Sequence, residues 1–76
     1  PNPTDGLFVL EINSKFDDLI NINVYNSAGT LVTSMKNIEV WAKNSWSFDL
    51  QNFSAGEYFL NITGKTENKT IKIIVQ

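Results

Sequence analysis

The sequence predicts an all-β fold: one antiparallel β-sandwich built from six or seven short strands. Two observations support this prediction. Apolar residues recur at every second position in several separate windows, which is the period of a strand with one buried face. Turn-forming residues such as Gly, Asn and Ser separate these windows. No window keeps a 3.6-residue period, so we expect little or no helix.

Four windows alternate clearly, and two shorter ones (residues 31–35 and 46–50) are less regular. The alternating sets are Phe8, Leu10 and Ile12; Ile20, Ile22 and Val24; Tyr58, Leu60 and Ile62; and Ile71, Ile73 and Val75. Residues of one set share a face of the sheet, with polar side chains on the other face. The predicted core holds Phe8, Leu10, Ile20, Ile22, Val24, Leu50, Tyr58, Leu60, Ile62, Ile71 and Ile73.

The segments between these windows have the composition of turns. Residues 1–6 read as an extended lead-in, because Pro cannot donate to a central ladder. Residues 15–18 read as a charged loop, and residues 26–29 as a tight hairpin in which Gly29 takes positive φ. Residues 53–56 form a corner at Gly56, and residues 64–68 a polar hairpin.

Length, charge and composition exclude several classes of function. The 76 residues suffice for one small domain, residues 1–76, and a hydrophobic fraction of 42% is typical of a folded chain. A net charge of −2 argues against a nucleic-acid partner. No apolar run approaches the roughly 18 residues of a membrane span, so we expect no direct membrane insertion. The chain begins with Pro1, and we expect a piece cut from the end of a longer secreted protein.

The residue types present do not suit catalysis or cofactor binding. There is no Cys and no His, so Ser and Thr lack their usual activating base and metals lack their commonest ligands. We expect no enzyme and no cofactor. Asp17 and Asp18 are the only carboxylate pair; they suit a weak calcium site or, by preference, a solvated loop, because Ca²⁺ takes about six to eight oxygens.

Two tryptophans leave a second function open. Trp46 alternates with Phe48 and is expected to fill the core or seal its edge, whereas Trp41 lies in a less regular stretch. An exposed Trp41, with Tyr25 or Tyr58, would suit a carbohydrate-binding or adhesive module appended to a secreted enzyme. A spacer without a partner is the third alternative.

Four sequence blocks, in order, resemble the C-terminal sorting domain of the Bacteroidetes type IX (Por) secretion system, type A. The first is a Pro-Asn-Pro opening followed by Gly; the second is a Val-Tyr-Asn strand that turns over Gly. The third resembles Asp-Leu-x-x-Leu-x-x-Gly-x-Tyr, with Phe53 where Leu is usual, and the fourth is a closing basic-apolar strand. The residues concerned are Pro1, Asn2, Pro3 and Gly6; Val24, Tyr25 and Gly29; Asp49, Leu50, Gly56 and Tyr58; and Lys72, Ile73, Val75 and Gln76.

The resemblance implies both a fold and a function. It implies an immunoglobulin-like sandwich of about seven short strands that follows an N-terminal cargo domain in the same chain. The partners it implies are the type IX translocon, an outer-membrane shuttle protein and a sortase-like surface peptidase that usually cuts the domain off. The implied destination of the cargo, reached through the periplasm, is the cell surface or the medium.

Overall fold

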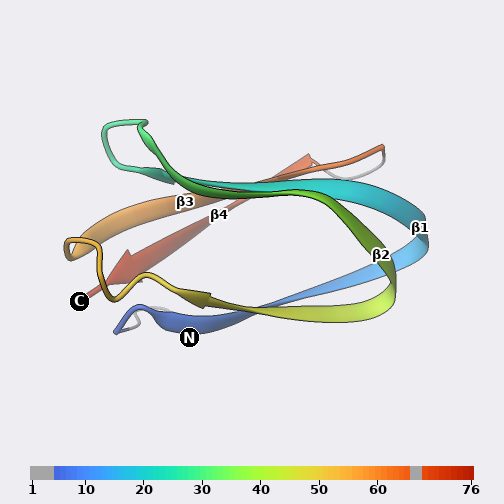
Figure 1. Ribbon diagram of the computed structural model, residues 1–76, viewed down its shortest axis with the longest axis horizontal. Coiled ribbons are helices and arrows are strands. Elements are labelled where there is room, and N and C mark those ends of the chain that lie inside the picture. Colours follow the sequence, from blue (N-terminus) through green and yellow to red (C-terminus); the bar gives the residue numbers. More distant parts are fainter. Residues whose placement is uncertain (1–4, 66–67) are drawn as a thin grey trace.

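The described residues form four antiparallel strands, whose arrangement can be followed in Figure 1. The computed structural model describes residues 5–65 and 68–76, without the side chains of residues 14–16. The strands form one sheet in the order β2-β1-β3-β4. Their bounds are Leu7–Asn26 for β1, Leu31–Asp49 for β2, Gly56–Thr63 for β3 and Asn68–Val75 for β4. The predicted lead-in at residues 1–4 lies outside the described residues.

The first two strands are much longer than predicted. Strand β1 has 20 residues and β2 has 19, and each contains two of the predicted short strands. The β1–β2 ribbon bends and folds back over itself in Figure 1. The all-β antiparallel prediction is confirmed, whereas the immunoglobulin-like arrangement of about seven short strands is not: the described residues form four strands in one curled sheet.

The prediction of a loop at residues 15–18 is wrong, because these residues belong to β1. Ser14 pairs with Ala42 and Asp18 with Val40, so four steps along β1 match only two along β2. The extra β1 residues form a bulge, which bends a strand without ending its pairing. In the sequence, the charged residues of this bulge therefore resemble a loop.

The core lies between the two halves of the folded ribbon and the β3–β4 hairpin. Every residue predicted to lie in the core is buried except Ile71, which is partly buried against it. Trp46 also packs against the core, as expected. Hydrophobic residues buried beyond those predicted are Ile12, Val40, Phe48 and Val75. The Phe48 ring stacks on Phe8 with a centroid distance of 5.3 Å.

The predicted β1–β2 hairpin forms, and β3 and β4 are antiparallel neighbours, although residues 66 and 67 of the second predicted turn lie outside the described residues. The β1–β2 turn closes with a hydrogen bond from Gly29 N to Asn26 O (3.0 Å), and Gly29 has φ +82°. Strands β3 and β4 pair from Gly56↔Val75 to Thr63↔Asn68 without a register shift. Within the described ranges, no helix has the length and apolar character needed to cross a membrane.

Candidate recognition surface

Three of the four sequence blocks, and the described part of the first, meet at one end of the sheet. Strand pairing sets Asn26 opposite Tyr58, and Tyr58 opposite Ile73. Gly6 accepts a hydrogen bond at its carbonyl from Leu50 N (2.7 Å). Figure 1 shows the β1–β2 turn, the loop before β3 and the C-terminus at this same end. We call this the motif end, comprising residues 5–6, 24–30, 49–58 and 72–76.

The loop that leads from β2 into β3 is held by the residues of the third block. Asp49 Oδ1 accepts a hydrogen bond from Gln51 N (2.9 Å), and Phe53 N donates to Leu50 O (3.1 Å). The Leu50 side chain is 1% exposed and anchors the turn in the core. The Asp-Leu pair of the motif thus fixes where β2 stops and how the chain turns.

Tyr58 fastens the second half of this loop. Its hydroxyl donates a hydrogen bond to the Ser54 carbonyl, and its ring lies 6.4 Å from that of Phe53. Gly56 has φ +148°, a conformation that side chains disfavour, although a Cβ atom added there would meet no other atom within 4 Å. The Gly-x-Tyr spacing therefore supplies one permissive backbone position and one side chain that holds the loop closed.

The glycine of the first block is required by close packing. A Cβ atom on Gly6 would lie 2.8 Å from Gln51 N and 3.0 Å from Gln51 Cα, and Gly6 has φ +112°. Only glycine lets the chain pass this close to the loop. The first and third blocks are thus complementary in shape.

The second block shapes the β1–β2 turn beside this loop. Asn26 Oδ1 accepts hydrogen bonds from Ala28 N (3.0 Å) and Thr30 N (2.9 Å). Tyr25, the neighbouring residue, is half-buried and pairs with Phe59 in β3. A hollow of about 250 Å³ lies between this turn and residues 53–58.

Half of the predicted site residues that the structure describes are buried and are not available to a partner. The buried members are Gly6, Val24, Leu50, Tyr58, Ile73 and Val75. The exposed members are Gly29, Asp49, Gly56, Lys72 and Gln76, whereas Pro1, Asn2 and Pro3 lie outside the described residues. Sequence reasoning missed the exposed Phe53 and Ile74 as surface residues of this end. The position of Ile74, out of phase with Ile73 and Val75, was the available signal.

Strand β4 is one of the two outer strands of the sheet, with β3 as its only strand neighbour in the described residues. It is straight and regular, and Lys72 forms an exposed salt bridge of 2.9 Å with Glu57 of β3. The other outer strand, β2, contains register shifts and two residues with positive φ, Asn37 (φ 56°) and Ala42 (φ 58°). Bulges of this kind hinder pairing with another chain, so β4 is the better template.

A groove of about 210 Å³ runs beside the first half of β4. Its apolar lining residues are Leu10, Ile12, Ile62 and Ile71, and its polar ones are Glu11, Asn13 and Lys69. No Cα atom of β4 lies within 8 Å of a Cα atom of β1. The groove thus separates β4 from the first half of β1. Its apolar lining lies next to the outer edge of β4.

The structure does not form the aromatic platform on which the carbohydrate-binding alternative depends. Tyr58 is buried, with 5% of its surface exposed, so it cannot stack on a sugar. Trp41 is 58% exposed but lies at the bend of the ribbon, whereas Tyr25 lies at the motif end, opposite Leu31. Trp41 is thus in the middle of β2, whereas Tyr25 of β1 pairs with the first residue of β2, so the two rings do not form one platform.

Asp17 and Asp18 are separated by the pleat of β1: Asp17 is exposed, and Asp18 is buried and accepts a hydrogen bond from Lys65 N (3.1 Å). The expectation that both lie in a solvated loop is wrong, since neither residue is in a loop. Among the described residues, no three His, Cys, Asp or Glu side chains are grouped as a metal site.

Comparison with known proteins decides the family. The family model described as "Secretion system C-terminal sorting domain" matches residues 1–76. The chain belongs to this family. Members are the C-terminal sorting signal domains of type IX secretion cargo proteins, found in Bacteroidetes, so the resemblance seen in the sequence is confirmed. Searches among curated proteins and among solved structures found no match.

Family membership gives the sorting domain its general function. It is an export signal: it directs an N-terminal cargo across the outer membrane and interacts with the type IX machinery. Sorting domains of this family are generally not catalysts. The geometry of the motif end and of β4 indicates which surface the machinery contacts.

Proposed function

We propose that the type IX machinery reads this sorting domain in its folded state, by pairing a strand of its own with the outer edge of β4. The observation that carries the proposal is the contrast between the two outer strands: β4 is regular, and β2 is interrupted by bulges. An extended segment added to a sheet edge gains main-chain hydrogen bonds along its length. A straight edge provides more of them than a bulged one.

The groove beside β4 supplies the side-chain part of this recognition. Alternate side chains of an added strand point to the same face, so they would lie over Leu10, Ile12 and Ile71. Glu11 and Lys69 border the same groove and favour a partner segment with complementary polar residues. Backbone pairing supplies affinity, and the groove supplies selectivity.

The motif end has a supporting role in this proposal. Its buried residues fix the loop before β3, which in turn fixes where β3 starts and where β4 ends. The exposed motif residues, Lys72 and Gln76 among them, lie on or next to the edge that the partner reads. Pro1, Asn2 and Pro3 belong to the proposed signal through the family pattern alone.

The proposed partners follow the family. They are the outer-membrane translocon, a shuttle protein and a sortase-like surface peptidase that removes the domain after export. The cargo precedes the domain in the same chain, passes through the periplasm, and reaches the surface or the medium. The domain itself performs no chemistry in this scheme, and residues 1–76 act as a single unit.

Reporter export tests the proposal. The chain is fused behind a periplasm-targeted reporter in a Bacteroidetes host with a working type IX system. The intact fusion is expected at the cell surface or in the medium. Deletion of residues 72–76 is expected to leave the reporter in the periplasm, because it removes half of the edge that the partner reads.

A matched variant separates loss of the edge from loss of stability. Ile73→Val with Val75→Ala removes apolar volume from the same buried positions but keeps the β4 backbone. Circular dichroism of each purified domain reports folding. The proposal predicts export of the double variant and retention of the deletion at equal folded fraction. Equal export of both would exclude β4 as the signal, and retention of the intact fusion would refute sorting by this chain.

A further inference from the structure

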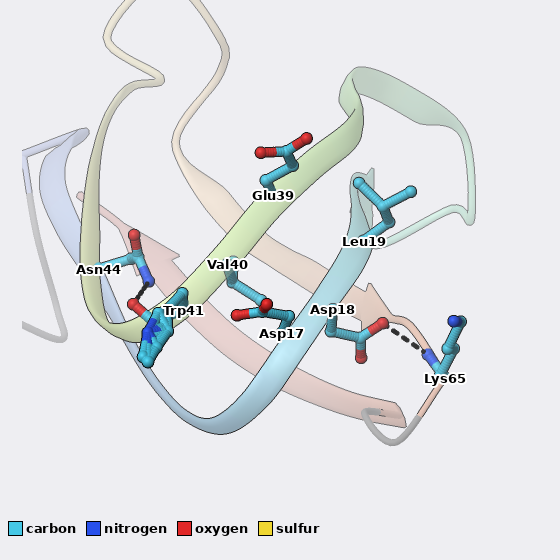
Figure 2. Close-up of a pocket in the computed structure, with 8 residues that line it drawn as sticks. All are labelled: Asp17, Asp18, Leu19, Glu39, Val40, Trp41, Asn44 and Lys65. Atoms are coloured by element: carbon cyan, nitrogen blue, oxygen red, sulfur yellow. Dashed lines mark hydrogen bonds between the residues drawn. The ribbon is translucent and has the colours of Figure 1, made fainter.

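Another hollow lies away from both the motif end and β4. It has a volume of about 490 Å³, within the range of roughly 300–1,000 Å³ typical of ligand pockets. It lies at the bend of the β1–β2 ribbon, next to the β3–β4 turn, as Figure 2 shows. Its lining residues are Asp17, Asp18, Leu19, Glu39, Val40, Trp41, Asn44 and Lys65.

Large apolar side chains are exposed at this hollow. Trp41 is 58% exposed and Leu19 is 53% exposed, whereas most other large apolar residues of the chain are buried. Asn44 Nδ2 donates a hydrogen bond to the Trp41 carbonyl (2.9 Å), which holds this part of β2 in place. The solvent-exposed side chains of Trp41 and Leu19 therefore form an apolar surface beside the hollow, as in many binding sites.

The charges around the hollow select the class of ligand. Three carboxylates and one ammonium group line it, so its formal charge is negative. Asp18 points toward Lys65, to whose backbone N–H it is hydrogen-bonded, whereas Asp17 and Glu39 are exposed. A cation is attracted both by carboxylates and by the face of an indole. A neutral sugar would use only the stacking surface.

We infer that this hollow binds an arginine side chain presented by a basic segment of a partner protein. The guanidinium stacks on the Trp41 indole and meets Asp17 and Glu39 at the mouth of the hollow. The aliphatic part of the arginine side chain covers Leu19, which removes apolar surface from water. A planar guanidinium suits this combination of aromatic face and carboxylates better than the compact ammonium of lysine.

Nuclear magnetic resonance of the 76-residue chain tests this binding directly. Its probes are a short blocked peptide that carries arginine, the same peptide with neutral citrulline in place of arginine, and a neutral oligosaccharide. The chain has two tryptophans, so the indole N–H signal of Trp41 is assigned with the Trp41→Phe variant. The arginine peptide is expected to shift this signal saturably, and the signal of Trp46 far less. Added salt should weaken the binding.

Two charge-neutralising variants complete the test. Glu39→Gln is expected to weaken binding of the arginine peptide at least about threefold, in line with a contact at an exposed site. Lys36→Gln neutralises an exposed side chain of β2 that does not line the hollow, and it is expected to leave binding unchanged. Equal binding of the citrulline peptide, equal effects of the two variants, or no shift with any probe would refute the inference. A shift with the oligosaccharide alone would assign the hollow to sugars instead.

Discussion

Single residues at the corners of this fold carry conformational and hydrogen-bonding requirements that can be measured. Gly56 has φ +148° at the start of β3, and Asp18 is a buried carboxylate hydrogen-bonded to a backbone N–H 47 residues away. Neither residue is hydrophobic, and neither belongs to the core. Both nonetheless connect parts of the chain that the core alone would leave free.

Gly56→Ala is expected to lower the free energy of unfolding by about 1 kcal/mol or more. An alanine at this φ is strained, although there is space for its Cβ. Urea denaturation of the purified domain measures the change. The exposed Asn52→Ala in the same loop is the control, with an expected change within about 0.5 kcal/mol. Equal unfolding free energies of the two variants would show that the backbone at position 56 does not require glycine.

Asp18→Ala is expected to cost about 1–3 kcal/mol, because it leaves Lys65 N without the oxygen it donates to. Asp18→Asn keeps an oxygen at the same position and should cost less than half as much. Thermal or urea unfolding of both variants measures the difference. If asparagine is as damaging as alanine, the negative charge, and not the hydrogen bond, is what the fold requires.

At the scale of elements, the alternating windows predicted the strands well and their boundaries poorly. The sets around Ile22 and Leu60 fall on β1 and β3 as expected, because one buried face imposes period two. The wrong strand boundaries lie in the segments between the alternating windows. Residues 15–18 and 36–42 interrupt the alternation, and a local pattern cannot tell a bulge within a strand from a loop between strands.

The candidate site was predictable in part, for a related reason. The motif blocks named the right segments, since turn chemistry at Asn26, Asp49 and Gly56 is local. Their meeting at one end depends on long-range pairing, such as Tyr58 opposite Ile73, which no local pattern contains. The hollow at Trp41 depends on the bend of the ribbon, so no local pattern predicts it.

At the scale of the whole molecule, the fold separates two kinds of surface. Strand β4 and the motif end offer backbone and apolar grooves, whereas the bend of the ribbon offers carboxylates and an indole. In Figure 1 the C-terminus lies at the end opposite the bend. The two proposed contacts use different residues, since none of those lining the hollow at the bend belongs to β4.

The central claim is that the domain is read while β4 remains paired with β3. Asn61 and Thr70 are opposite each other in the two strands, and Asn61 Nδ2 donates a hydrogen bond to Thr70 Oγ1 (3.2 Å). Their Cα atoms are therefore at a separation that a disulfide can bridge, roughly 4.5–5.5 Å. The chain has no cysteine of its own, so Asn61→Cys with Thr70→Cys creates one defined link between β3 and β4.

Export of this linked domain is the most direct measurement. The fraction of reporter outside the cell is compared between the double-cysteine fusion and each single-cysteine fusion, with disulfide formation verified by thiol labelling. If β4 is read as an edge of an intact sheet, the linked domain is exported as efficiently as the single-cysteine forms. Retention of the linked domain in the periplasm, relieved by a reductant, would show that β4 must leave β3 and would contradict the account.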